Sequence, residues 1–365
     1  MIGWSDINSH FKVMDVTSNK LVADKWFIGS ALMGIDFRNL AAGNYFYSQD
    51  TIWTRMLDIS EINPYWEIHN VTSNYLSVDN NDGVSVLISI LQSVRDIFSI
   101  APVDIIVVGN DMSTFNDYGC CTVFDNVTIP FLLDDTLVGT YLKVFVRRAN
   151  RYYPLFDCTQ FRVDGKQYFE INMNTQYLEV ALEGIASVFH STKYTDVNSN
   201  LLGRVPTVDE LKTNNDLVRG LSLLECLAFI GKANVLPNAS YLGHSTKKIL
   251  KKFAITLLKL ELVSSSWQTL LPDMYVDHIY KQIEAISKLN ISAYLSHDKF
   301  TLADRYGITP EVFDFKTGVN ERVFTYAIDS IRYFTDLPFL GDAVELDQFE
   351  TVIRRIVDRK VRTKS

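Results

Sequence analysis

Proline and glycine are both scarce in this chain. Its 365 residues include only 9 Pro and 17 Gly. Because these two residues interrupt regular elements, their scarcity argues against a loop-rich or low-complexity chain. A hydrophobic fraction of 47% and a charged fraction of 21% also exclude an intrinsically disordered protein. We therefore expect an ordered protein built from long helices and strands.

Cysteine is scarce as well, and its four residues are Cys120, Cys121, Cys158 and Cys226. No Cys-x-x-Cys pair occurs, and no histidine stands at a spacing typical of a zinc site. Cys120 and Cys121 are adjacent, a geometry in which a disulfide strains the intervening peptide. We therefore expect free thiols in a reducing, cytoplasmic compartment and no bound cofactor.

Long apolar runs are missing. The run Ile255–Val263 is interrupted by Lys259 and Glu261, and it falls short of the roughly 20 residues that a membrane-spanning helix needs. The first twelve residues already carry Asp6 and Lys12, which does not fit a secretory signal. We expect a soluble protein with no membrane partner.

Positive charge is lacking in the N-terminal part of the chain. Residues 1–150 contain 9 Lys and Arg against 17 Asp and Glu, whereas residues 151–365 contain 26 of each. The net charge of −8 therefore belongs to the N-terminal part. Because an acidic surface repels nucleic acid at long range, a contact with a polyanion requires local basic patches, which we expect in the second part.

The standard catalytic signatures are absent too. The chain has no phosphate-binding P-loop, no Gly-x-Gly-x-x-Gly, no Gly-x-Ser-x-Gly and no His-Glu-x-x-His. The six histidines are scattered, and no two stand at helical spacing. We therefore assign no catalytic residue and favour a protein that is not an enzyme.

The length of the chain exceeds the usual size of one hydrophobic core. The spacing of apolar residues also changes along it, which divides the chain into regions. Residues 1–119 are interpreted as an α/β region, 120–190 as an antiparallel β meander followed by a helix, and 207–365 as a helical region. Residues 120–190 fit either a separate domain or an insertion. The expected fold class is α+β, with a mixed α/β N-terminal part that carries the small meander and a mainly helical C-terminal part.

In the first region we expect a strand over Trp26–Ile35, a helix over Gly83–Ser99 capped by Asn81 or Asp82, and a strand over 103–109. This order is typical of a crossover unit with a parallel sheet. In the second region, Asp164-Gly165 predicts a tight hairpin. The strands expected there are Cys121–Ile129, Thr140–Arg147, Tyr152–Phe156, Thr159–Val163 and Tyr168–Asn172.

The last region has helical periodicity almost throughout. Thr207 and Glu210 match a capping box at the start of a helix, and Leu217–Gly231 predicts a core helix. The polar stretch Lys193–Pro206 predicts a linker before them. The other expected helices are Tyr177–Phe189, Ser245–Val263, Tyr275–Leu289, Ser296–Ala303, Glu321–Phe334 and Leu346–Val361.

Two carboxylates follow expected strands and are candidate metal ligands. Asp36 comes after Trp26–Ile35, and Asp111 comes after the strand at 103–109. Acidic residues that converge from strand ends hold Mg²⁺ in two-metal nucleases, because hard cations prefer oxygen ligands. Aspartate also ends strands and caps helices through its own hydrogen bonds, and we expect this role for Asp111.

Two basic clusters are candidate nucleic-acid contacts. In the expected helix at 245–263, two pairs of lysines four residues apart form a positive stripe opposite an apolar face of Ile249, Leu250 and Phe253; these lysines are Lys247, Lys248, Lys251 and Lys252. A stripe near a helix start is disfavoured by the helix dipole, which hints at an anionic partner, although a solvated face explains it as well. A second cluster joins Arg147, Arg148 and Arg151 to Tyr152 and Tyr153, as in single-strand binders or in a hairpin loop.

The order of several stretches resembles the flap endonuclease and 5′ exonuclease superfamily. These stretches are Asp36 after its strand, PVDIIVVGND at 102–111, Thr195-Asp196-Val197-Asn198, and IGKANVLPNASYLGHSTKKILKKF at 230–253. In that family, a strand-end aspartate, a later cluster of acids and a helix-turn-helix after a Gly-x-Asp-Tyr-Leu-Pro-like stretch follow in this order.

The chain departs from that family at most positions of its metal ligands. Gly109 or Asn110, Asn198, and Ala233-Asn234 stand where acids are expected. The resemblance therefore implies a degenerate metal-dependent nuclease fold that binds nucleic acid without cleaving it.

Two function hypotheses follow. The first is a non-enzymatic structural, assembly or scaffolding protein that acts through protein–protein interfaces, because 22 Phe and 18 Tyr suit large interfaces. Its partners are other protein subunits in an oligomer or larger assembly, and abundant Asn, Tyr and Asp suit a viral or phage structural component. The alternative is a nucleic-acid-binding protein with the degenerate nuclease fold, and Mg²⁺ as its cofactor if it is active.

Overall fold

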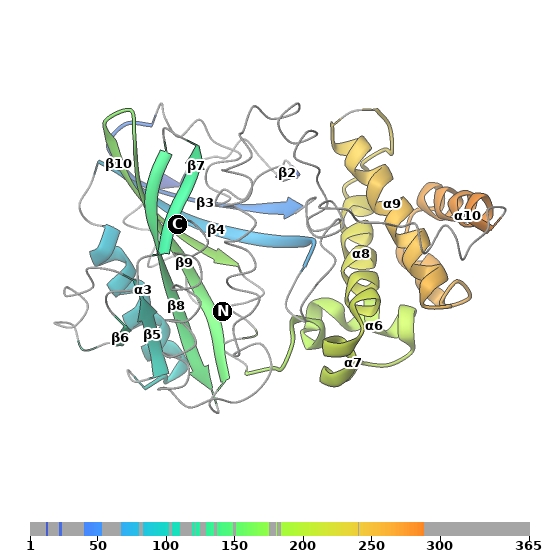
Figure 1. The fold of residues 1–365 in the computed structure, drawn as a ribbon, viewed down its shortest axis with the longest axis horizontal. Coiled ribbons are helices and arrows are strands. Elements are labelled where there is room, and N and C mark those ends of the chain that lie inside the picture. The colour runs from blue at the N-terminus through green and yellow to red at the C-terminus, as the bar shows by residue number, and fades with distance from the viewer. Residues whose placement is uncertain are drawn as a thin grey trace, which may run out of the picture.

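A computed structural model shows a sheet in the N-terminal part of the chain and a helical part on its C-terminal side (Figure 1), which confirms the predicted fold class. The structure describes residues 12–13, 22–23, 40–52, 67–79, 83–101, 104–109, 119, 121–124, 129–134, 137–148, 151–174, 180, 184–239 and 241–287. Asp36, Asp111 and the predicted strand at 26–35 lie outside these residues, as do the proposed caps at 81 and 82 and the helices predicted after residue 289. Within the described part, no helix is both long and apolar enough to cross a membrane.

The described strands form one mixed sheet. Its central order is β3 (Gly43–Ile52), β4 (His69–Val78), β10 (Lys166–Asn174), β9 (Arg151–Val163), β8 (Leu137–Arg148), β5 (Ile105–Val108) and β6 (Thr122–Phe124). Strands β1 (Lys12–Val13) and β2 (Val22–Ala23) pair with β3, and β7 (Ile129–Asp134) pairs with β8. The pairs β1–β3, β2–β3 and β5–β6 are parallel and the other pairs are antiparallel.

The predicted meander is present as β8, β9 and β10, and β7, which was not predicted, precedes them; each of these strands is antiparallel to the next. The first predicted strand, Cys121–Ile129, is described over 122–124 as β6, which pairs in parallel with β5 and lies outside the meander. Asp164 and Gly165 form its last turn with φ angles of 52° and 79°, the left-handed values that the Asp-Gly pair predicts. The two strands predicted between residues 152 and 163 form one strand, β9. Asp157 looks like a turn residue in the sequence, but it lies within β9 and forms an ion pair with Lys143 on β8.

Of the predicted crossover, the helix and the second strand are present, whereas the first strand, predicted over Trp26–Ile35, lies outside the described residues. Helix α3 (Gly83–Phe98) follows β4 and precedes β5, and these two strands run in the same direction. They are not neighbours, because β10, β9 and β8 lie between them. The expectation of a parallel sheet is therefore wrong for most described pairs, since the later meander occupies the middle of the sheet.

Helix α3 covers one face of this sheet (Figure 1). Its residues Leu87, Leu91 and Val94 are buried and share a core with Val144 of β8. The helix approaches the sheet closely at Gly83, where an added Cβ would lie 2.5 Å from the ring of Phe169. A glycine at this position lets the helix begin against the sheet.

The helical part contains α6 (Thr195–Leu202), α7 (Val208–Thr213), α8 (Asn215–Lys232), α9 (Tyr241–Lys259) and α10 (Asp273–Ser287), with 3₁₀ turns η4 (Val188–His190), η5 (Thr192–Tyr194) and η6 (Ser266–Leu270). The capping box is confirmed. Thr207 Oγ1 accepts a hydrogen bond of 3.2 Å from the Glu210 amide, and the Glu210 carboxylate accepts one of 2.7 Å from the Thr207 amide. The predicted core helix is confirmed as α8, which is buried along most of its length.

The linker predicted over Lys193–Pro206 is wrong. Most of this stretch is helical, as the end of η5 and all of α6. Its sparse apolar residues Val197 and Leu201 are four apart, so both lie on one face of α6 and are buried. The many polar residues between them hid this short amphipathic helix, which ends at Gly203 in a left-handed conformation.

Candidate functional site

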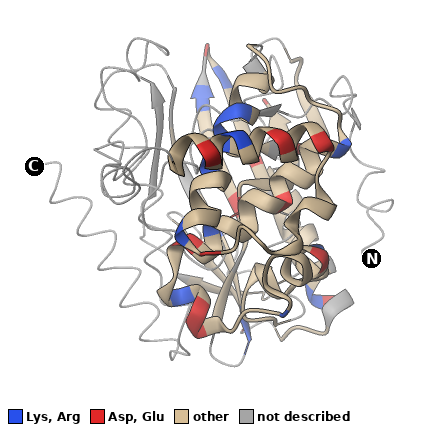
Figure 2. Ribbon diagram, turned by 90° about the vertical axis from the view of Figure 1, so that its right-hand side faces the viewer, with Lys and Arg blue, Asp and Glu red and all other residues tan. Residues whose placement is uncertain are grey.

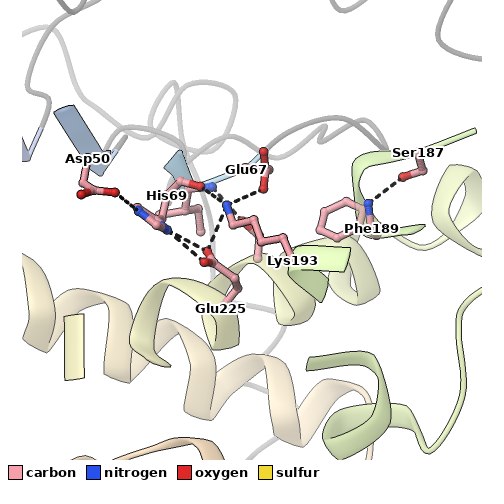
Figure 3. A network of polar contacts seen from close by, with 9 residues as sticks. Asp50, Glu67, His69, Ser187, Phe189, Lys193 and Glu225 are labelled. Atoms are coloured by element: carbon pink, nitrogen blue, oxygen red, sulfur yellow. Dashed lines mark hydrogen bonds and ion pairs between the residues drawn. The ribbon is translucent and has the colours of Figure 1, made fainter. Parts of the chain in front are cut away.

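Five charged side chains meet where the sheet contacts helix α8 (Figure 3). Asp50 lies near the end of β3, and His69 is the first residue of β4. Glu67 precedes β4, Lys193 lies on η5 and Glu225 lies on α8. We call these five residues the junction cluster. Beside them, the Ile68 amide donates a 2.7 Å hydrogen bond to Ser222 Oγ, so the backbone of the sheet is also joined to α8.

His69 is held between two carboxylates. Its Nδ1 lies 2.9 Å and 3.2 Å from the two carboxylate oxygens of Glu225, and its Nε2 lies 3.1 Å from Asp50 Oδ1. The ring stacks on Phe229 with 3.7 Å between ring centroids, and only 4% of the residue is exposed. Burial by itself lowers the pKa of His69, but Glu225 and Asp50 outweigh it and raise this pKa above its usual value. The geometry fits an imidazolium that donates from both nitrogens.

The hydrogen-bonding capacity of the Lys193 ammonium is also fully used. Its Nζ donates to Glu67 Oε1 at 2.7 Å and to the His69 carbonyl oxygen at 2.7 Å, and it lies 3.5 Å from Glu225 Oε2. An ammonium has three N–H donors, and three acceptors surround this one. Burial by itself lowers the pKa of Lys193. Glu67 and Glu225 raise this pKa by a larger amount, so it lies above its usual value. This lysine is therefore positively charged at neutral pH.

The two buried carboxylates of the cluster differ from each other. Burial raises the pKa of Glu67, and Lys193 offsets this only in part. Burial also raises the pKa of Glu225, but Lys193 and His69 together bring it below its usual value. The difference follows from position, because Glu225 contacts both cations of the cluster. Tyr194, next to Lys193, has its pKa raised by burial and by the same two carboxylates.

This arrangement favours a structural clamp over a catalytic centre. A general base needs a nitrogen that can accept a proton from a substrate, and a nucleophilic lysine needs to be neutral. Both nitrogens of His69 face carboxylates, and the Lys193 ammonium is surrounded by acceptors. Over the described ranges, no group of three or more His, Cys, Asp or Glu side chains is arranged to hold a metal ion.

The candidate metal ligands Asp36 and Asp111 both lie outside the described residues, so the Mg²⁺ site stays a prediction. The stretch at 195–198 begins α6, and the stretch at 230–253 forms the end of α8, a loop and most of α9.

The lysine stripe lies on α9. Lys247, Lys248 and Lys251 are exposed and Lys252 is half-buried, while the opposite face of Ile249, Leu250 and Phe253 is buried as predicted. The helix starts at Tyr241, so the stripe occupies the second and third turns. The helix dipole acts mainly within the first turn, so it does not disfavour these lysines, and the expected sign of an anionic partner is lost. Lys251 and Lys252 each interact with other groups of the chain.

The arginine cluster lies at the turn between β8 and β9, where Arg148 pairs with Arg151, as the hairpin alternative predicts. Arg147 Nε donates a 2.9 Å hydrogen bond to Asp104 Oδ1 in an ion pair. The rings of Tyr152 and Tyr153 are buried. Buried rings cannot stack on nucleic-acid bases, so in this structure the proposed single-strand site lacks its aromatic contacts.

Sequence reasoning missed the whole junction cluster. One signal for it is present, because Glu225 is the single charged residue within the apolar run at 220–231. A carboxylate buried in a core helix requires a partner cation, which points to an ion pair with another segment. The identity of that segment has no local signature.

Comparisons with known proteins add little. No family model matches the chain, and no curated protein matches it. The solved apo structure of histidyl-tRNA synthetase from S. aureus aligns with 10% sequence identity and a TM-score of 0.29, over 40% of this chain and 46% of the synthetase. The chain thus spans less than half the length of that protein, and a likeness this low carries no argument about function.

Proposed function

We propose that this chain is a non-enzymatic assembly protein that binds other protein subunits through its helical part. The observation that carries the proposal is the location of the exposed large apolar side chains. Among the described residues these are Val205, Leu236, Met274 and Tyr280, and all four belong to the helical part. Exposed apolar side chains suit contacts with another protein, which removes them from water.

Two of these side chains are chain neighbours of the residues that join α10 to the loop before α9. Leu236 follows Val235, whose carbonyl oxygen accepts a hydrogen bond from the Tyr275 hydroxyl, and Met274 precedes Tyr275. Leu236 and Met274 are 54% and 47% exposed. The start of α10 and the loop before α9 therefore each present an exposed apolar side chain, and a hydrogen bond joins their chain neighbours.

The charges around this place also favour a protein partner. On the helical side of the molecule, basic and acidic residues are interspersed (Figure 2). Helix α9 contributes exposed Lys247 and Lys248, and α10 contributes exposed Asp273, Asp277 and Lys281. A mixed surface fits the polar rim of a protein interface, whereas a polyanion favours a surface of one sign. The viral or phage component fits this proposal on composition alone.

The experiment compares the wild-type protein with the double variant Leu236→Asp/Met274→Asp by sedimentation velocity over a wide concentration range, together with capture of co-expressed partners. Ser85→Asp, at an exposed position on α3, is the matched control. We expect a wild-type assembly that the double variant loses and the control keeps. A wild-type protein that stays monomeric at high concentration and binds no co-expressed partner would remove the proposal.

A further inference from the structure

The junction cluster requires a proton that histidine readily loses. Nδ1 and Nε2 of His69 both lie within hydrogen-bonding distance of carboxylate oxygens, which only accept. A neutral imidazole donates from one nitrogen and presents a lone pair at the other. Loss of one proton therefore places that lone pair against either Asp50 or Glu225.

The titratable and charged groups that face His69 come from every element around it. Asp50 on β3, Glu225 on α8 and Lys193 on η5 act on His69 directly. Glu67 before β4 and Tyr194 on η5 join the cluster through Lys193 and Glu225. With His69 protonated, Asp50 and Glu225 contact a cation on the imidazole, and Lys193 adds a second cation; with His69 neutral, Lys193 alone offsets them. Because the site is buried, water screens this imbalance poorly.

The same contacts hold the sheet to the helical part. Glu225 and Ser222 are the α8 side of the junction, and His69 and Ile68 are the sheet side. Phe229, also on α8, stacks on the His69 ring, and an imidazolium is attracted to an aromatic face. The contacts of Glu225 and Phe229 with the His69 ring both weaken when the ring becomes neutral.

We propose that the contact between the start of β4 and helix α8 is a pH-dependent joint, closed while His69 is protonated and loosened when His69 loses its proton. The joint goes beyond the assembly function and does not depend on it. The direction follows from the contacts. A histidine whose folded pKa is raised contributes its full stabilisation below its unfolded pKa of about 6.5, and this is lost as pH rises through the folded pKa.

The test is amide hydrogen exchange of the full chain between about pH 6 and about pH 9, corrected for the intrinsic exchange rate. Protection of residues 67–71 and 222–229 should fall by about tenfold for each pKa unit by which the closed joint raises the pKa of His69. Residues 83–98 of α3, which take no part in the hydrogen bonds and ion pairs described for the cluster, should show no such fall. Equal pH dependence in both regions, or none in either, would overturn the proposal.

Two variants assign the effect to His69. In His69→Gln, the extra pH dependence at 67–71 and 222–229 should disappear, whereas in His278→Gln it should remain. His278 is the relevant control because burial and the nearby Lys247 and Lys281 lower its pKa, so its own contribution has the opposite sign. If His69→Gln does not fold, Asp50→Asn serves instead. Asp50 is partly exposed, and loss of its charge should move the midpoint of loosening to lower pH. An unmoved midpoint would also refute the joint.

Discussion

Glu67 and Glu225 share one cation, Lys193, yet their pKa values shift in opposite directions. Glu67 has the shorter contact with Nζ, at 2.7 Å against 3.5 Å. Glu225 has the lowered pKa because it also contacts His69 at 2.9 Å. Contact with a second cation therefore distinguishes Glu225 from Glu67 in this cluster.

The first prediction compares these two carboxylates. Glu225→Gln removes the shared partner of two buried cations and should lower the free energy of unfolding by about 3 kcal/mol. Glu67→Gln leaves one carboxylate between those cations and removes a charge that burial disfavours, so its cost should stay within about 1 kcal/mol. Urea denaturation at neutral pH measures both. Equal losses in the two variants would contradict this account of the cluster.

The second prediction concerns the capping box of α7. Thr207→Ala removes the Oγ1 acceptor for the Glu210 amide and should cost about 1 kcal/mol. Ser199→Ala, at an exposed position on α6, is the control and should change stability little. Thermal unfolding of the two variants side by side provides the measurement. A destabilisation no larger than that of the control would mean that the cap contributes nothing.

The third prediction tests the nucleic-acid alternative. Titration of the protein into fluorescent single-stranded and flap DNA, with and without Mg²⁺, should give anisotropy changes that weaken steeply with salt if the lysine stripe binds phosphates. Replacing Lys247, Lys248, Lys251 and Lys252 with Glu should then abolish binding, and unchanged affinity would exclude the stripe. Cleavage that requires metal would instead support Asp36 and Asp111 as ligands.

The sequence predicted well the elements that local periodicity defines. Helix α8 and the meander were found because apolar spacing and the Asp-Gly turn are short-range signals. Strands β3 and β4 were missed because polar residues interrupt their alternation of apolar and polar side chains. Asn74 and Ser77 of β4 are examples, and both of these side chains are buried.

The junction cluster was not predictable for a different reason. His69 and Glu225 are 156 residues apart in the chain, and their contact exists only after the sheet and the helical part have come together. Neither residue lies in a local sequence pattern that identifies the other as its partner. Lys193 was placed in a linker, so its role as the cation of the cluster was hidden as well.

The order of strands in the sheet also sets an order of folding. Val78 of β4 pairs with Tyr168 of β10, so α3, β5 and four further strands, β6 to β9, are synthesised before β4 gains its second neighbour. Until then, a ribosome-bound chain presents an unpaired edge on β4, the kind of edge that recruits other strands. Such long-range pairing slows folding, so β4 keeps this edge longer than a strand whose neighbours are close in the chain.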